Sequence, residues 1–257
     1  MKKSILWIAA TVFLVLVVGI VLYSLAQPCE LETHEYELKE NFRDIIISTD
    51  TADIQVVLSE NASSFVVCEE EKNANHAVTV KDHTLRIEIV NHKKWYEYIW
   101  INLRTPKITV YLGKSEIGDI SIKADTGNIL LENIFATGKF EIDTDTGDVT
   151  LEACGASEVV IETDTGNVLL DSVIATGKLA IETDTGHVEF ENCDASAVFM
   201  KTDTGNVTGS FLTDKVIFAE SDTGSVDVPK VIADEKCEII TDTGNIKITI
   251  AQGDKNR

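Results

Sequence analysis

Residues 159–170 read Val-Val-Ile-Glu-Thr-Asp-Thr-Gly-Asn-Val-Leu-Leu, and the Asp-Thr-Gly triplet within this stretch occurs seven times in the chain. Successive triplets are spaced by 19 or 20 residues. A short motif that returns on a fixed period of this length is the signature of a repeat architecture. The residues that begin the triplets are Asp125, Asp145, Asp164, Asp184, Asp203, Asp222 and Asp242.

Apolar residues stand at fixed positions on both sides of each triplet. In the quoted repeat, Val159 and Ile161 lie five and three positions before the Asp, and Val168 lies four positions after it. The same positions are apolar in all seven repeats, and apolar residues at a spacing of two indicate a β-strand with one buried face. Each repeat is therefore predicted to be a strand, a tight turn and a second strand. Successive repeats must stack to bury their apolar faces.

The glycine of each triplet is predicted to form the turn between the two strands. Glycine readily adopts the positive φ that the third position of a type II turn requires. An Asp before it can accept hydrogen bonds from the backbone N–H groups of the turn. The turn glycines are Gly127, Gly147, Gly166, Gly186, Gly205, Gly224 and Gly244.

These patterns predict an all-β fold, a β-solenoid or stacked β-strand repeat with rungs of 19–20 residues, preceded by one N-terminal transmembrane helix. A looser pattern before the first triplet includes a degenerate rung at residues 44–58, a hairpin around 81–83 and a strand at 107–112. We expect this region to cap the first edge of the stack. The expected organisation is a cytoplasmic N-terminus (1–4), a transmembrane signal anchor (5–26), a linker (27–43), an N-terminal cap with divergent β-repeats (44–119), the Asp-Thr-Gly repeat domain (120–250) and a C-terminal tail (251–257).

Residues 5–26 form an uncharged, apolar run that is long enough to cross a bilayer as a helix. Lys2 and Lys3 precede this run, so the positive-inside rule places the N-terminus in the cytoplasm and the C-terminal domain outside the cell. We therefore expect a single-pass protein of the cell membrane. The alternative is a signal peptide cleaved after Ala26, although the run is long for that role. Lipid attachment at Cys29 is disfavoured because the preceding Leu-Ala-Gln-Pro lacks the small residues that such processing requires.

The chain is strongly acidic, with 43 Asp and Glu against 22 Lys and Arg and a formal net charge of −21. Because Lys2 and Lys3 are the only charged residues before Gln27, the acidity belongs entirely to the part expected outside the membrane. Proteins that bind nucleic acid or dock on anionic lipid need a positive surface. Neither class fits this domain, and no nucleic-acid partner is expected.

Stacking would place the seven Asp carboxylates of the triplets in a row, roughly 4.8 Å apart. Charges at that distance repel by about 0.9 kcal/mol per pair even at the dielectric constant of water. Hydrogen bonds from the turn are the simpler source of compensation. The alternative is that Ca²⁺, which prefers carboxylate oxygens, bridges neighbouring rungs through the seven Asp residues. A second acidic column follows on the next strand and consists of Glu132, Glu152, Asp171 and Glu191.

One short segment departs from the acidity. Residues 92–104 contain three basic residues and both tryptophans outside the membrane segment. The simpler interpretation is a strand that covers one end of the stack with its aromatic face. The alternative is a recognition strip for sugar rings or a protein partner, formed by Trp95, Tyr96, Tyr98 and Trp100.

No catalytic constellation emerges from the sequence, and we expect no enzymatic activity. Asp-Thr-Gly is also the triplet of aspartic proteases, but those enzymes need two facing carboxylates, whereas seven copies on one period lie in a row. Threonines beside the Asp column form rows such as ice-binding solenoids carry, but a charged residue separates them here. The five cysteines fit no disulfide framework. Three of them, Cys154, Cys193 and Cys237, fall in apolar columns and are expected to be buried thiols.

The run Pro106-Lys-Ile-Thr-Val-Tyr-Leu112, followed by Ile120-Ser-Ile-Lys-Ala-Asp-Thr-Gly-Asn-Ile129 and six further triplets, resembles the toastrack-type family of candidate adhesins, a bacterial domain of unknown function. The resemblance covers roughly residues 44–250. It implies a right-handed stack of mainly parallel strands outside a bacterial cell, a role in adhesion or envelope-stress sensing, and no catalytic residues. The chain departs from the family at Gly113, where members commonly have proline.

The sequence thus predicts a non-enzymatic, membrane-anchored, extracytoplasmic, adhesin-like β-repeat protein that mediates cell-envelope or surface interactions. Its expected partners are the membrane, through the N-terminal helix, and an envelope protein or polysaccharide. Repetitive display of shallow corners would replace a single deep pocket, with avidity supplying affinity. The alternatives are an envelope-stress sensing or signalling component that acts with a membrane partner, and a calcium-stabilised surface repeat protein.

Overall fold

The computed structural model describes residues 31–61, 63–71, 75–90, 105–113 and 117–251, together with the helical positions 13, 17 and 19. Apart from those three positions, the predicted membrane segment 5–26 lies outside the described residues. Within the described ranges, no helix is both long and apolar enough to cross a membrane.

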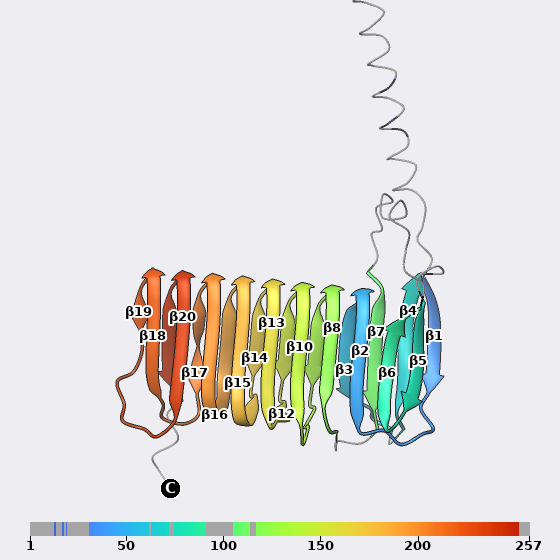
Figure 1. Ribbon diagram of the computed structural model, residues 1–257, viewed down its shortest axis with the longest axis horizontal. Helices are drawn as coiled ribbons and strands as arrows, with labels where there is room; N and C mark the ends of the chain where they lie inside the picture. Colours follow the sequence, from blue (N-terminus) through green and yellow to red (C-terminus); the bar gives the residue numbers. More distant parts are fainter. Residues whose placement is uncertain are drawn as a thin grey trace, which may run out of the picture.

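Two long sheets form the sides of an elongated stack, as Figure 1 shows. The leading sheet contains the strands that precede the Asp-Thr-Gly corners, and its strands pair in a fixed spatial order. That order is β5 (His76–Lys81), β6 (Thr84–Ile89), β2 (Asp44–Thr51), β8 (Ile120–Thr126), β10 (Lys139–Thr146), β13 (Glu158–Thr165), β15 (Ile174–Thr185), β16 (Val188–Thr204), β20 (Lys236–Thr243) and β18 (Val216–Thr223).

The trailing sheet contains the strands that follow the corners, and it is ordered in the same direction. Its strands are β1 (Leu31–Glu37), β4 (Phe65–Glu71), β7 (Lys107–Leu112), β3 (Asp53–Leu58), β9 (Ile129–Glu132), β11 (Val149–Glu152), β14 (Val168–Asp171), the first residues of β16, β17 (Val207–Phe211), β21 (Ile246–Ile250) and β19 (Val226–Asp227). The short β12 (Gly155–Ala156) pairs with the start of β15 at the opposite corner. The predicted all-β stack of repeats is therefore confirmed.

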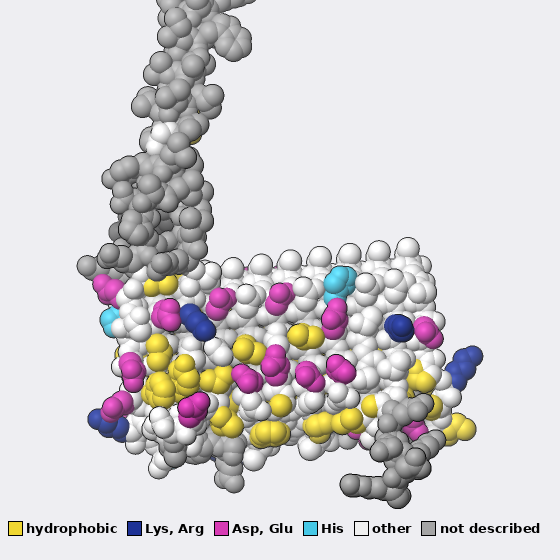
Figure 2. Space-filling view, turned by 180° about the vertical axis from the view of Figure 1, so that it is seen from behind, with side chains coloured by type: hydrophobic (Ala, Val, Ile, Leu, Met, Phe, Trp, Pro, Cys, Tyr) yellow, Lys and Arg dark blue, Asp and Glu magenta, His cyan; other side chains and the backbone are white. Residues whose placement is uncertain are grey.

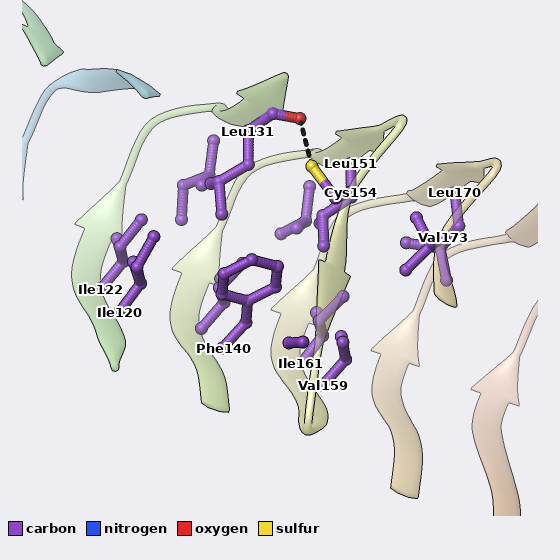
Figure 3. Packing of buried hydrophobic residues seen from close by; sticks show 14 of the residues in the cluster. Ile120, Ile122, Leu131, Phe140, Leu151, Cys154, Val159, Ile161, Leu170 and Val173 are labelled. Carbon is purple, nitrogen blue, oxygen red and sulfur yellow. Dashed lines mark hydrogen bonds between the residues drawn. The ribbon is translucent and has the colours of Figure 1, made fainter. Parts of the chain in front are cut away.

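The repeats stack in register, so each apolar position contacts its equivalents in the neighbouring rungs. Ile161 pairs with Ile142 on one side and with Ile181 on the other, and all three side chains are at most 1% exposed. Figure 3 shows Ile161 and Val159 of the leading sheet on the same side of the strand as Phe140, with Leu151 and Leu170 of the trailing sheet facing them. The spacing-of-two pattern predicted this core because alternate side chains of a strand point to the same face.

The order of the last two rungs differs from the order of the sequence. Strand β20 lies between β16 and β18, and β21 lies between β17 and β19. Residues 236–250 are thus inserted into the stack, and the preceding repeat occupies its end. The inserted rung has buried Ile246 and Ile248, whereas Val226 of the terminal rung is 43% exposed. The more apolar rung takes the interior position, because a terminal repeat must tolerate solvent on its outer face.

The other end of the stack is closed by antiparallel strands. The degenerate rung at residues 44–58 forms β2 and β3, and the predicted hairpin and strand form β5, β6 and β7. Asp82 and His83 make the hairpin turn with φ of 51° and 61°. The segment expected to be a linker, 27–43, also contributes to this end, because it contains strand β1.

The glycines of the triplets are required by close stacking. A Cβ atom on Gly205 would lie 1.8 Å from the carbonyl oxygen of Gly186 in the neighbouring rung, and each of the other six triplet glycines would meet a backbone oxygen within 2.0 Å. Only Gly127, Gly147 and Gly244 of the seven have a positive φ, between 141° and 159°. The type II turn predicted from the sequence is therefore not the shared reason for glycine, and contact between rungs is.

Candidate functional site

The Asp residues of the triplets lie in one column at the end of the leading strands. Six of the seven are exposed and Asp203 is half-buried. Asp50 continues the column beyond Asp125. Among the described residues, none of the seven carboxylates accepts a hydrogen bond from its own turn, so that part of the prediction is wrong. Asp203 instead forms an ion pair with Lys201 at 3.0 Å.

Asp125 is affected both by burial and by the neighbouring carboxylates of this column. Partial burial, followed by the neighbouring carboxylates of Asp50 and Asp145, raises the pKa of Asp125 above its usual value. Within the described ranges, no group of three or more His, Cys, Asp or Glu side chains is arranged to hold a metal ion. A calcium ion shared by two neighbouring triplets therefore stays a prediction.

The residue after each triplet glycine forms a ladder of hydrogen bonds from rung to rung. The side chain of Asn167 accepts a bond from the backbone N–H of His187 at 2.9 Å, and Nδ1 of His187 accepts one from the backbone N–H of Asn206 at 2.9 Å. In spatial order the ladder consists of Asp53, Asn128, Asp148, Asn167, His187, Asn206, Asn245 and Ser225. Sequence reasoning missed this function, although the repeated Gly-Asn pair was its signal.

Threonines before the Asp residues form an inner column. Thr183 and Thr202 are buried, and each donates its hydroxyl to the carbonyl oxygen of the glycine in the neighbouring rung, at 3.2 and 3.0 Å. Ser221 does the same towards Gly244 at 2.8 Å. These bonds satisfy the carbonyls that the glycine contacts bring close together.

Threonines after the Asp residues form an outer column that is exposed to solvent. Its members stand in register on successive strands: Thr51, Thr126, Thr146, Thr165, Thr185, Thr204, Thr243 and Thr223. The outer threonines, the triplet glycines and the ladder residues line a shallow groove of about 700 Å³, which we call the corner groove. It repeats one hydroxyl and one side-chain hydrogen-bonding group every rung, and these can bind an extended polar polymer.

The trailing sheet carries the second acidic column on its outer face. Glu132, Glu152, Asp171 and Glu191 pair in register on adjacent strands, and Figure 2 shows acidic side chains in a row on one face of the stack. Hydrophobic side chains lie beside the row of acidic side chains in Figure 2, and Phe135, three positions after Glu132, is 54% exposed. The predicted column therefore exists as a striped acidic and apolar surface.

The comparison with protein families decides the identity of this stack. The family model described as Toastrack DUF4097 matches residues 42–256, which is most of the chain. The chain belongs to the toastrack family. The resemblance inferred from the triplets is thereby confirmed. The search of curated proteins gave no match.

Solved structures with this fold come from bacteria. A candidate adhesin from Bacteroides fragilis superposes with a TM-score of 0.59 and 21% identity, over 86% of this chain and 98% of that chain. A candidate adhesin and a candidate lipid-binding protein from Parabacteroides distasonis give TM-scores of 0.48 and 0.47 at 12% and 16% identity, over 86% and 85% of this chain and 98% and 97% of theirs. At 21% identity, the likeness to the first of these structures shows the fold alone.

A hydroxyl, a histidine and a carboxylate are linked inside the N-terminal end of the toastrack domain. Glu70 Oε2 lies 2.8 Å from His76 Nδ1, and His76 Nε2 lies 2.8 Å from the hydroxyl of Thr49. This order of groups is that of a catalytic triad, but the three residues are at most 4% exposed. A substrate therefore has no access to these three side chains as they stand, and no sequence spacing among residues 49, 70 and 76 signalled the contact.

The remaining predicted positions are the thiols and the recognition strip. Cys154, Cys193 and Cys237 are buried and free, as predicted. The strip Trp95, Tyr96, Tyr98 and Trp100 lies outside the described residues. Strand β6 precedes this segment and β7 follows it. Strands β1 and β7 run in the same direction, because both are antiparallel to β4. The end of β6 and the starts of β7 and β1 therefore lie at the same edge of the domain.

Proposed function

We propose that this toastrack protein is a non-enzymatic, membrane-anchored, extracytoplasmic adhesin that binds a polymer of the cell envelope along its corner groove. The observation that carries the proposal is the repetition of one small site. The outer threonine, the triplet glycine and the ladder residue recur on every rung from residue 128 to residue 244. A linear polysaccharide presents hydroxyl groups at regular intervals and can contact several rungs at once.

Affinity in such a groove comes from the number of contacts. Each rung offers an exposed hydroxyl and a polar ladder side chain, whose hydrogen bonds replace bonds to water and contribute about 1 kcal/mol or less each. Once one unit of a polymer is bound, its next unit is held close to the next rung, so each further contact forms at a high effective concentration and raises the overall affinity. The adhesin therefore needs length and repetition in place of a deep pocket.

The arrangement of the N-terminal end supports anchoring. Residues 5–26 have the length and composition of a membrane helix, and β1 begins five residues after this run at the edge of the stack that β6 and β7 also reach. The aromatic and basic segment 92–104 connects β6 to β7. Tryptophan, tyrosine and lysine are enriched at membrane interfaces, so this segment suits the surface of the bilayer beside the anchor.

Binding of purified envelope polysaccharide to the full chain in detergent tests the proposal. Substitution of Thr146, Thr165, Thr185 and Thr204 by valine removes four hydroxyls but keeps β-branched side chains, and we expect binding to fall at least about tenfold. Thr150→Val with Thr208→Val on the trailing sheet is the matched control and should bind normally. Equal binding by both variants would refute the groove. Partners captured only through residues 1–30 would favour the signalling alternative.

A further inference from the structure

The two ends of the stack differ in how they are closed. At the N-terminal end, the edge strand β1 carries Glu32, Glu35 and Glu37, and charged side chains discourage pairing with other chains. At the other end, residues 216–219 of β18 read Val-Ile-Phe-Ala and carry no charge. Phe218 is 60% exposed there, and Val226 of β19 is 43% exposed.

Strand β18 has one free edge among the described residues. Its only strand partner there is β20, to which it is parallel over residues 216–223. The free edge therefore presents a row of backbone N–H and C=O groups, which is a template for pairing with another strand. The companion strand β19 has two residues and is followed by Pro229, so it cannot extend the trailing sheet in the same way.

Apolar surface surrounds this edge. Ile217 and Ala219 face the interior but are only half-buried, because no further rung covers them. Ile232, in the connection between β19 and β20, is 100% exposed. The same connection borders a hollow of about 890 Å³ with a mixed lining, in which Leu212, Val228 and Ile250 accompany polar residues such as Asp214 and Asp227. Exposed apolar surface next to an open strand marks an interaction site.

We infer that β18 pairs antiparallel with β18 of a second copy of this chain, so that two stacks join end to end about a two-fold axis. This inference rests on the proposed function as an adhesin and names its partner at this end. A second copy is the occupant that fits, because it presents an open strand with a half-buried apolar face of the same width. Self-complementary contact of this kind is the usual form of a two-fold interface.

The aromatic side chain of Phe218 favours one register. With the axis at Phe218, the two Phe218 rings stand opposite each other and Ile217 faces Ala219 of the second copy. Val216 then faces Glu220 of the second copy, and no two carboxylates of residues 216–220 lie opposite each other. Shifting the axis to Ala219 would place Val216 opposite Asp222 of the second copy and would lose the aromatic pair.

The joined stacks would have their anchors far apart. The leading sheet has ten described strands, which span about 43 Å at the usual strand spacing. Because β1 lies at the opposite end of the stack from β18, as Figure 1 shows, the two membrane anchors would lie at the two outer ends of the pair. This geometry suits copies on apposed membranes, which makes the contact homophilic adhesion.

Disulfide trapping tests the pairing in the full chain, in a Cys29→Ser background. Opposite residues of an antiparallel pair have Cα atoms about 4.5–5.5 Å apart, within the range of a disulfide. We expect Phe218→Cys to form covalent dimers under mild oxidation. Val216→Cys is the control on the same strand, because the new thiols would lie four residues apart across the axis and should not cross-link. Equal cross-linking of both variants, or none of Phe218→Cys, would overturn the inference.

Vesicle clustering tests the adhesive consequence. Full chain reconstituted in phosphatidylcholine vesicles should cluster them, and Phe218→Glu should reduce clustering at least about tenfold, equivalent to ~1.4 kcal/mol. Phe135→Glu is the matched control, because Phe135 is a similarly exposed phenylalanine on another face, and it should cluster normally. Clustering that survives Phe218→Glu would refute homophilic contact. The polysaccharide assay with groove variants is independent of this result, so failure of either proposal is recognised separately.

Discussion

The carbonyl oxygen of Gly186 lies 1.8 Å from the position that a Cβ atom on Gly205 would occupy. No side chain fits in that space, because the obstacle is the backbone of the neighbouring rung. Backbone cannot move away as the end of a flexible side chain can. The triplet glycines are therefore the points at which neighbouring rungs of the toastrack domain approach most closely.

Gly205→Ala should destabilise the domain by about 3 kcal/mol or more, because the extra methyl must push two rungs apart. Ala52 stands in the same column at the N-terminal end and provides the control. Ala52→Gly should cost only about 1 kcal/mol, through chain entropy and a lost buried methyl. Urea unfolding measures both. A loss below 1 kcal/mol for Gly205→Ala would contradict the close-approach explanation.

The core of the fold was predictable from local patterns. Val159 and Ile161 stand two positions apart and recur on a fixed period, and burial follows directly from these two properties. The position of the last rung was not predictable, because residues 216–227 and 236–250 carry the same motif. Their order depends on which of the two rungs gains more by burial between its neighbours. That gain is a property of all the side chains of a rung and not of its motif.

The position of each corner was predictable from the sequence, but the side chain that makes its hydrogen bonds was not. The sequence located the triplet Asp and the glycine, yet it assigned the hydrogen bonds to the Asp side chain. The ladder uses the next position instead, where Asn167 and His187 offer acceptors to the following rung. A bond between residues 20 positions apart has no local signal, so only their repetition could have suggested it.

His187 tests the ladder, because its Nδ1 accepts the backbone N–H of Asn206 at 2.9 Å. His187→Asn keeps a side-chain acceptor and should leave the free energy of unfolding within about 0.5 kcal/mol. His187→Ala removes the acceptor and should cost about 1 kcal/mol. Chemical denaturation compares the two variants. Equal stabilities would show that the ladder contributes nothing measurable.

The buried thiols should be unreactive in the folded chain. Burial raises the pKa of Cys154 to about 11 and that of Cys237 to about 12, and Figure 3 shows Sγ of Cys154 directed at the carbonyl of Leu131, 3.4 Å away. Because the thiolate is the nucleophile, alkylation by iodoacetamide at pH 8 should occur only after unfolding.

The same thiols should make the free energy of unfolding decrease at alkaline pH. Thiols of the unfolded chain ionise near pH 9, before those of the folded chain. Their contribution to stability is therefore complete below about pH 9 and is lost as the pH rises towards 11. A Cys29→Ser background leaves only the four buried cysteines for both measurements. Rapid alkylation of the folded chain at pH 8 would contradict the prediction.

Lys215 should hold the two C-terminal rungs to the stack. Its fully buried Nζ donates to the carbonyl of Ala195 at 2.7 Å and contacts carboxylates of Asp194 and Glu235 at 2.6 and 2.5 Å. Lys215→Met keeps the volume but removes these bonds, and should cost about 1–3 kcal/mol. Hydrogen exchange should accelerate in β18 and β20 but not in β10. A uniform change across all three strands would argue against a local role.

Removal of a triplet carboxylate should have opposite effects on stability depending on whether the column is repulsive or binds calcium. Asp164 has a triplet Asp on each side, and no hydrogen bond or ion pair to its carboxylate is found among the described residues. If repulsion is uncompensated, Asp164→Asn should stabilise the domain by up to about 2 kcal/mol at low salt, and the gain should vanish near 1 M salt, where the Debye length is about 3 Å.

Calcium reverses that expectation. If Ca²⁺ bridges Asp164 to its neighbours, the melting temperature of the unmodified chain should rise in millimolar calcium and fall with a chelator. Asp164→Asn should then lose part of that rise. Magnesium is the control, because it keeps its own waters and suits wide carboxylate pairs poorly. An unchanged melting temperature with calcium and with chelator would refute calcium binding, and repulsion between the carboxylates would remain as the explanation for the column.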